Sequence, residues 1–320
     1  MPSMLVTNMQ AAVGAGGTHD VIPPAGQEYL IRDVANDVAF VANVPDIQVA
    51  LRDGVHLNAI ILIDPTTSPG RRTRQLELYL THAMYMRLTN TGAGAGNLSW
   101  IGERVRAGLS ISNIVTIGVG ATVNIQPPAG QTWRITEWGA SAFTGAGDIN
   151  PNVIIGITDG TLVASMIVQP TMVRGQDKEY DFIIDHDVYL RVTDNSGAGI
   201  DFGYSGRREP YTCISSVQDV AGSGNLDIIP PAGQEWVITE IAAETWGGAG
   251  APNDYPDIGV SVRVGANLSD VLEAGSVATS LRWNQRLFIP IDNTHYLRIV
   301  ETSTANNEVG VLGFLRRGYS

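Results

Sequence analysis

Short runs of apolar residues rich in Val, Ile and Thr alternate along the chain with clusters of Gly, Pro, Asn and Asp. Helical periodicity is hard to find. This pattern is typical of β-strands joined by tight turns. We expect strands at the clearest runs, which are Ile60–Ile63, Val153–Ile157, Phe182–Ile184, Val188–Val192 and Ile258–Val264. The pattern therefore predicts an all-β protein.

A Pro-Pro-Ala-Gly-Gln segment occurs three times, beginning at Pro23, Pro127 and Pro230. These prolines are 104 and 103 residues apart, which is the length of a small domain and not of a solenoid repeat. A Tyr-x-Arg strand keeps nearly the same spacing and contains Arg87, Arg191 and Arg298. With roughly seven or eight strands per copy, the repeat predicts three tandem β-sandwich, jelly-roll-like domains at residues 1–107, 108–209 and 210–320.

Each repeated segment is expected to form a turn, because proline presets the first corner and glycine accepts a positive φ. A strand should follow, on which Tyr29, Trp133 and Trp236 share a face with an isoleucine two positions later. Apolar alternation after the same residue class favours packing of these rings into the cores. An aromatic cage for a sugar or a cation is the alternative interpretation.

An acid comes two positions after each of these isoleucines, as Asp33, Glu137 and Glu240. Because the arginines Arg87, Arg191 and Arg298 recur with the acids, we consider a charge-assisted, bidentate pair inside each copy. The alternative is that both side chains face water.

Composition narrows the classes of function. Charged residues are 16% of the chain, against about 25% in a typical globular domain. Either much of the surface is an interface, or it is rich in Ser, Thr, Asn and Gly. The net charge of −12 argues against nucleic-acid binding. With no apolar run of about 18 residues and no secretory signal pattern, we expect a protein made in a cytoplasm that does not contact a membrane.

No pattern of catalytic or metal-binding residues stands out. His82 and His186 precede their tyrosines by three residues, but Asn293 takes this place in the third copy, so strand-edge packing is the preferred interpretation. The run Gly92–Gly96 lacks the ending of a phosphate loop. The single cysteine, Cys213, permits no disulfide and no cysteine-based metal site. We expect no enzyme activity, no cofactor and no metal.

Two stretches in which the copies differ are candidate partner contacts. Arg71, Arg72 and Arg74 are expected to form a basic loop, for which a solvated loop is the default interpretation and contact with an acidic partner surface is the alternative. Trp246 and Tyr255 lie in the longest loop of the third copy, where a tyrosine flanked by prolines is a candidate contact element.

The pattern Pro-Pro-Ala-Gly-Gln-x-Trp-x-Ile-Thr-Glu, followed later by a Tyr-Leu-Arg strand, resembles short β-rich structural proteins of tailed bacteriophages. The pattern covers a small part of each copy. The resemblance implies a non-enzymatic virion component, such as a capsid decoration, head-fibre or tail protein, that contacts other virion proteins. No functional residue carries over with it.

Two other classes of function stay open. A carbohydrate- or receptor-binding β-sandwich would use exposed aromatic platforms, for which the candidates are Trp100, Trp246, Trp283 and Tyr255. An enzyme acting on a polymer would need carboxylates that converge in a groove. For the structural class, three copies in one chain favour a homo-oligomeric or pseudo-symmetric assembly.

Overall fold

The computed structural model describes residues 4–38, 47–56, 59–64, 71–142, 153–169, 182–245, 258–265, 267–274, 282–301 and 307–318. Every regular element in these residues is a β-strand, and the strands form six four-stranded antiparallel sheets. The expected all-β class is confirmed. Across the same ranges, no helix is long and apolar enough to cross a bilayer.

The described residues contain 24 strands, which fall into three consecutive groups. The first group is β1 (Met4–Val13), β2 (Thr18–Val21), β3 (Glu28–Val38), β4 (Ile47–Arg52), β5 (Ala59–Asp64), β6 (Arg71–Leu80), β7 (Tyr85–Asn90) and β8 (Gly96–Val105). The second is β9 (Ser110–Ile117), β10 (Thr122–Ile125), β11 (Thr132–Ala142), β12 (Val153–Thr158), β13 (Val163–Gln169), β14 (Phe182–Ile184), β15 (Tyr189–Asp194) and β16 (Ile200–Glu209). The third is β17 (Cys213–Val220), β18 (Asn225–Ile228), β19 (Gln234–Thr245), β20 (Ile258–Val264), β21 (Asn267–Ala274), β22 (Arg282–Ile291), β23 (His295–Glu301) and β24 (Asn307–Gly318).

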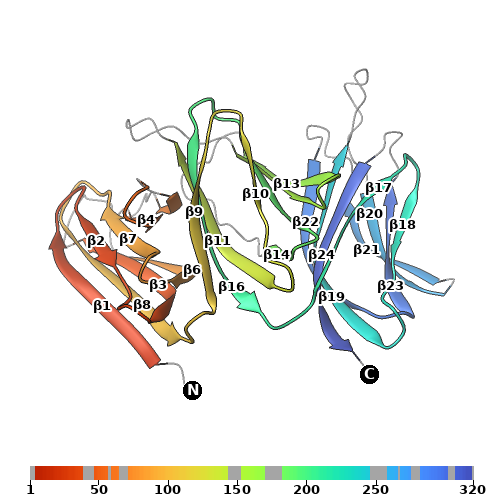
Figure 1. The fold of residues 1–320 in the computed structure, drawn as a ribbon, viewed down its shortest axis with the longest axis horizontal. Helices are drawn as coiled ribbons and strands as arrows, with labels where there is room; N and C mark the ends of the chain where they lie inside the picture. Colours follow the sequence, from red (N-terminus) through yellow and green to blue (C-terminus); the bar gives the residue numbers. More distant parts are fainter. Residues whose placement is uncertain are drawn as a thin grey trace.

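Each group builds two sheets with the same strand order. In the first group the orders are β1-β8-β3-β6 and β2-β7-β4-β5, and the other two groups repeat them strand for strand. This mixing of early and late strands is the jelly-roll arrangement. We call the three pairs of sheets the first, second and third sandwich, and Figure 1 shows them side by side in chain order. The division into domains at residues 1–107, 108–209 and 210–320 stays a prediction.

Each sandwich encloses an apolar core between its two sheets. Buried side chains in the three cores include Ile31 and Leu78, Ile135 and Phe182, and Ile238 and Ile299 respectively. The second core continues into the third sandwich, because Val217, Ala242 and Leu312 pack against it. The sandwiches are therefore joined by packed side chains as well as by short connections.

The repeated proline segment forms the same turn in every sandwich. Its first prolines, Pro23, Pro127 and Pro230, are buried. The N–H of the segment's glutamine donates to the carbonyl of the second proline at 2.9, 3.0 and 3.0 Å. The intervening glycine has φ of 77°, 77° and 82°, as a type II turn requires. The second proline thus occupies the first position of the turn and not its first corner, which belongs to the alanine.

The aromatic residues after this turn are half-buried, so the prediction that they are core residues holds only in part. Tyr29, Trp133 and Trp236 each pack against the core of their own sandwich. The indole N–H groups of Trp133 and Trp236 donate to the side chains of Gln131 and Gln234 at 3.0 and 2.8 Å. The glutamine satisfies the polar atom of the ring at the rim of the core, which explains why the two residues recur together.

Two of the three repeated arginines make ion pairs, but the predicted partners are wrong. Arg87 binds Asp20 through two hydrogen bonds of 2.5 and 2.6 Å, and Arg298 binds Asp227 through two of 2.6 Å. These hydrogen bonds raise the pKa of both guanidinium groups. Arg191 donates to the neutral Asn124 at 3.3 Å. The partners lie on β2, β10 and β18, directly across the ladder, whereas Asp33, Glu137 and Glu240 belong to the other sheet.

Two tryptophans of the second sandwich allow a matched test of this burial. Trp138 is 1% exposed and stacks on Phe202, with ring centroids 5.9 Å apart. We expect Trp138→Ala to cost about 3–5 kcal/mol of unfolding free energy. Trp133→Ala should cost about 2 kcal/mol, because part of its ring already faces water. Denaturant unfolding of the two variants measures the difference, and equal losses would contradict the rim position of Trp133.

Candidate functional site

The predicted partner-contact residues are only partly placed by the structure. Trp246, Tyr255 and the side chains of Arg71, Arg72, Arg74 and Trp283 lie outside the described residues. The backbone of the three arginines belongs to β6, where it pairs with Asp37, Asn36 and Val34 of β3. The expected basic loop is therefore wrong at these positions, because the ladder with β3 extends to Arg71. A role for these residues in partner contact stays a prediction.

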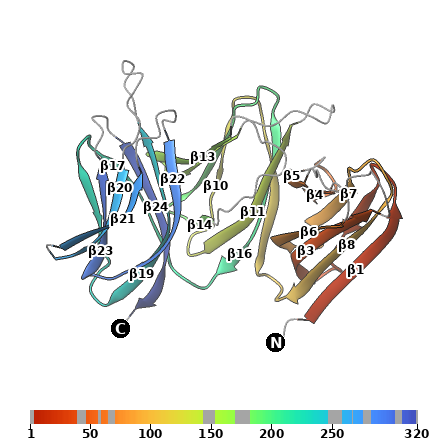
Figure 2. The ribbon, with the colours of Figure 1, turned by 180° about the vertical axis from the view of Figure 1, so that it is seen from behind.

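At the contacts between sandwiches, several polar side chains of one sandwich bind backbone groups of another. Strands β5 and β6 of the first sandwich lie against β9, β11 and β16 of the second. Figures 1 and 2 show the second sandwich between the other two. Strand β6 is the last strand of its sheet, so its outward N–H and C=O groups face away from the neighbouring strand. Side chains from the second sandwich meet these groups.

The outward backbone groups of Tyr79 are satisfied by two serines of the second sandwich. Ser205 Oγ accepts from the Tyr79 N–H at 2.7 Å and lies 2.9 Å from the Tyr79 carbonyl oxygen. Ser112 Oγ donates to the same carbonyl at 2.5 Å. The phenol of Tyr79 accepts from Arg207 at 3.3 Å, and burial raises its pKa. Tyr79 is 1% exposed, so this contact is closed to water.

Two residues earlier on the same edge, Glu77 is held in the same way. Its N–H donates to Glu137 Oε1 at 2.9 Å, and its C=O accepts from Thr136 Oγ1 at 2.6 Å. The acid that recurs after each aromatic strand thus serves, in the second sandwich, as an acceptor for a backbone edge. Sequence reasoning missed this role because it requires knowing which face of the strand the next unit covers.

The second and third sandwiches meet through the same elements with more apolar chemistry. Strands β13 and β14 lie against β17, β19, β22 and β24. Cys213 Sγ donates to the carbonyl of Ile183 at 3.2 Å, and Glu308 Oε2 accepts from the Val163 N–H at 3.0 Å. Leu312 occupies the ladder position that Ser205 has in the second sandwich and is fully buried. One edge-on-face geometry is therefore built twice, once polar and once largely apolar.

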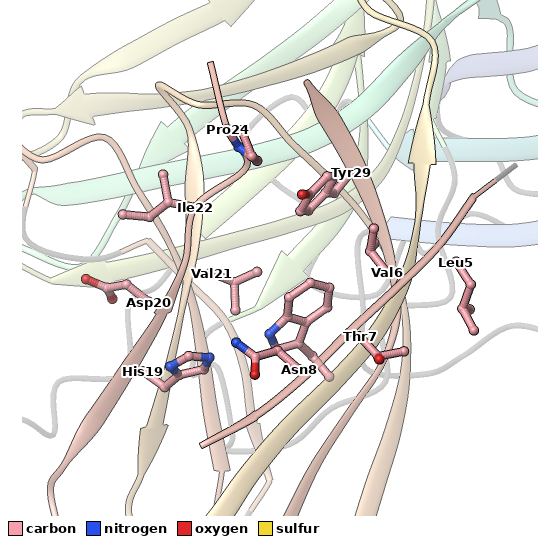
Figure 3. A pocket seen from close by; sticks show the side chains of 11 residues that line it. Leu5, Val6, Thr7, Asn8, His19, Asp20, Val21, Ile22, Pro24 and Tyr29 are labelled. Carbon is pink, nitrogen blue, oxygen red and sulfur yellow. The ribbon is translucent and has the colours of Figure 1, made fainter. Parts of the chain in front are cut away.

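A cavity of about 530 Å³ opens in the first sandwich between the edge strands β1 and β2. Its polar and aromatic lining includes Asn8, His19, Tyr29 and Trp100. Figure 3 shows the imidazole of His19 and the amide of Asn8 pointing toward one another, while Asp20 points away. Trp100 is 7% exposed, so it is no surface platform for a ligand, although it forms one wall of this cavity.

The lining of this cavity differs from the matching positions of the other sandwiches. Val123 and Leu226 take the ladder position of His19, and Val311 takes that of Trp100 in the third sandwich. The His19 Nε2 and Trp100 Nε1 atoms are buried without a hydrogen-bond partner. Burial lowers the pKa of His19, which keeps the imidazole neutral at pH 7. The cavity can therefore offer uncharged hydrogen-bonding groups beside two aromatic rings.

Catalytic and metal-binding arrangements do not emerge from the part of the chain that is described. There, no cluster of three or more His, Cys, Asp or Glu side chains is placed to hold a metal ion. His82 and His186 lie with Nδ1 2.9 and 3.1 Å from the carbonyls of Pro23 and Pro127, where they tie a loop to the proline turn. Burial raises the pKa of the Cys213 thiol, so it is a poor nucleophile.

No protein-family model and no curated protein matches this chain. Solved structures with a similar arrangement include one of Sulfolobus turreted icosahedral virus, 12% identical over 98% of this chain and 90% of that chain, with a TM-score of 0.26. Another, on the triple jelly-roll fold and turret assembly of an archaeal virus, is 12% identical over 99% and 90%, with a TM-score of 0.25. PNGase F, a glycosylasparaginase from Flavobacterium meningosepticum, is 9% identical over 66% and 97%, with a TM-score of 0.35. With overlap this weak, we transfer no role from these proteins.

Ser205 offers a direct test of the edge contact. Ser205→Ala removes the acceptor of the buried Tyr79 N–H and should cost about 1–3 kcal/mol of stability. Thr122→Ala is the matched control, since its hydroxyl bonds only the exposed Thr193, and it should change stability by less than about 0.5 kcal/mol. Denaturant unfolding of both variants provides the comparison. If the serine variant is as stable as the control, the edge contact contributes nothing.

His19 makes the stability of the first sandwich depend on pH. Its folded-state pKa lies below the ordinary value of 6.5, because burial disfavours the charged imidazole. The unfolded chain therefore takes up the proton first, and the stability due to neutral His19, present above pH 6.5, is lost as the pH falls through the lower folded-state pKa. We expect His19→Val, which copies the second sandwich, to gain in melting temperature over the wild type on acidification below 6.5. A difference that is constant with pH would contradict the burial of His19.

Proposed function

We propose that this protein is a non-enzymatic structural component of a virion that acts through protein–protein contacts. In finer terms, it is a capsid decoration or cement protein, or a head-to-fibre or tail component, of a tailed bacteriophage. It is made in the host cytoplasm and works on the particle. Its partners are other virion proteins, and its assembly is homo-oligomeric or pseudo-symmetric.

The observation that carries this proposal is the edge-on-face contact, built twice in one chain. A protein that closes the edge of one β-sandwich with the face of the next is suited to hold neighbouring units at fixed angles. Glu28 adds to this, because its carboxylate accepts from the N–H groups of Gly108 and Ser110 at 2.5 and 2.8 Å and so holds the first connection. The low charged fraction of 16% supports extensive contact surface on the outside as well.

A carbohydrate- or receptor-binding role is the second candidate, and the cavity of the first sandwich favours it. Its neutral imidazole, indole N–H and aromatic walls are the groups that commonly hold a hydroxylated, uncharged ligand. Of the aromatic platforms expected for such a module, Trp246, Tyr255 and the side chain of Trp283 lie outside the described residues. Trp100 lines the cavity from within the sandwich.

The structural role predicts stoichiometric binding to virus particles. Purified chain should co-sediment with particles that lack it and saturate at a fixed number per particle, with unlabelled chain competing for the same sites. Cryo-EM of the reconstituted particles should then show three sandwiches in a row as added density. A monomer that binds no particle component but binds a defined glycan, with loss of binding in a Trp100→Phe variant, would replace the structural role by the second candidate.

A further inference from the structure

Among the described residues, the edge-on-face contacts leave the outer face of one sheet uncovered and leave Phe288 and Pro290 of one edge strand exposed. The first sandwich uses its β5–β6 edge, and the face of its β1-β8-β3 sheet corresponds to the faces that the second and third sandwiches use. In the third sandwich the edge strand that corresponds to β6 is β22, which also contacts β13 of the second sandwich. We propose that the β22 edge of one molecule docks on the β1-β8-β3 face of a second copy of this chain. The inference rests on the proposed structural role and names its partner.

The free face has exposed apolar side chains at two of the positions that carry the internal contacts. Ile101 lies opposite Asp33 after a bulge, as Ser205 lies opposite Glu137 and Leu312 opposite Glu240. Yet Ile101 is 47% exposed, while Leu312 is fully buried by the second sandwich. Leu5, which matches the position of Cys213, is 69% exposed. A large apolar side chain that is exposed to water at such a contact position is expected of a surface that binds the edge of another unit.

The free edge is apolar in the same register. Pro290 lies opposite Val237, as Tyr79 lies opposite Leu30 and Ile183 opposite Arg134. Phe288 stands two residues earlier, in the place of Glu77, and is 73% exposed. Both residues of the edge that matter in the first internal contact are therefore replaced by exposed apolar ones.

The hydrogen-bonding groups of the free edge and the free face match. In the first internal contact Ser205 accepts from the Tyr79 N–H; in the proposed contact Pro290 has no N–H, and Ile101 offers no acceptor. Thr7 occupies the position of Ser112, so it can donate to the Pro290 carbonyl as Ser112 donates to Tyr79. Pro290 lacks the donor and Ile101 lacks the matching acceptor, so neither group would be left unsatisfied in the contact. This match favours the edge and the face as partners.

The free face also has a donor and an acceptor where Thr136 and Glu137 bind the backbone of Glu77. Arg32 takes the bulge position of Thr136 as a donor, and its side chain is 47% exposed. Asp33 takes the position of Glu137 as an acceptor. Together they can meet the C=O and N–H of Phe288 in the way that Thr136 and Glu137 meet those of Glu77. Because an edge binds a different surface on the next copy, the association is heterologous and grows into a ring or a fibre.

Sedimentation velocity of the full chain and of single-interface variants tests this assembly. Wild type should form species larger than a monomer whose size increases with concentration. Ile101→Asp and Phe288→Asp should each weaken self-association at least about tenfold by burying a carboxylate in the contact. Val119→Asp is the control, since Val119 is 64% exposed in a turn outside both surfaces, and it should assemble like wild type. Melting curves confirm that each variant is folded.

Mixing the two blocked variants decides the geometry. The Ile101→Asp chain keeps a working edge and the Phe288→Asp chain keeps a working face, so the mixture should form dimers of one chain of each kind and nothing larger. A folded wild type that stays monomeric at all concentrations overturns the proposal, and so does a mixture without dimers. Normal assembly of Phe288→Asp beside loss in Ile101→Asp would mean a symmetric face-to-face dimer and would also overturn it.

A second pair of variants probes the missing hydrogen bond itself. Pro290→Ala restores an N–H opposite Ile101 and should weaken assembly about tenfold, because a buried donor is left unsatisfied. Adding Ile101→Ser supplies the acceptor found at Ser205 and should restore it. If Ile101→Ser does not restore assembly, the proposed register is wrong.

A chain that stays monomeric yet binds particles would support the structural role and contradict this interface. A chain that self-associates but binds no particle component would support the interface and contradict the virion role.

Discussion

The unpaired edge of a β-sheet is the constraint on which this molecule depends. An edge strand exposes a row of N–H and C=O groups that must find partners if the edge is buried. Here the edge of one sandwich is covered by the face of the next, and hydroxyl, thiol and carboxylate groups take the place of a neighbouring strand. This solution sets the angle between units, because the partners sit at fixed ladder positions on both sides.

The two internal contacts show how far the chemistry can change while the geometry stays. Around Tyr79 the contact is a network of hydroxyl groups, whereas at the second contact a thiol meets the carbonyl of Ile183 and Leu312 is buried in the core of the second sandwich. Gly310 has no Cβ because a Cβ there would overlap the side chain of Ile157 across the interface. The apolar version therefore brings the backbone of one sandwich against side chains of the other. Both versions exclude water, which is the property that makes the arrangement rigid.

Much of the fold could be predicted from the sequence because its determinants are local. The Pro-Pro-Ala-Gly-Gln turn needs only its own residues, and it appears in all three sandwiches with a positive φ at glycine. The strand at Phe182–Ile184 was also predictable from its apolar run. The partner of Arg87 was not, because pairing in a jelly roll joins strands far apart in the chain and brings Asp20 opposite it. The role of Glu137 depended on the first sandwich covering its strand, which no local pattern reveals.

The divergence of the three sandwiches separates what the fold requires from what is free to specialise. A glycine recurs opposite the bulge of β3, β11 and β19, where a Cβ would overlap the backbone, so this position cannot vary. The position next to it in the same strand carries Ile101, Ser205 or Leu312. These three residues face different surroundings outside their own sandwich. Neighbouring residues of a strand point to opposite faces of the sheet. The inner face therefore packs the core of the sandwich, and the outer face determines which neighbouring unit it contacts. The three copies therefore differ in function-determining residues on the outer face of one sheet, and these residues are adjacent in sequence to the positions that the fold requires.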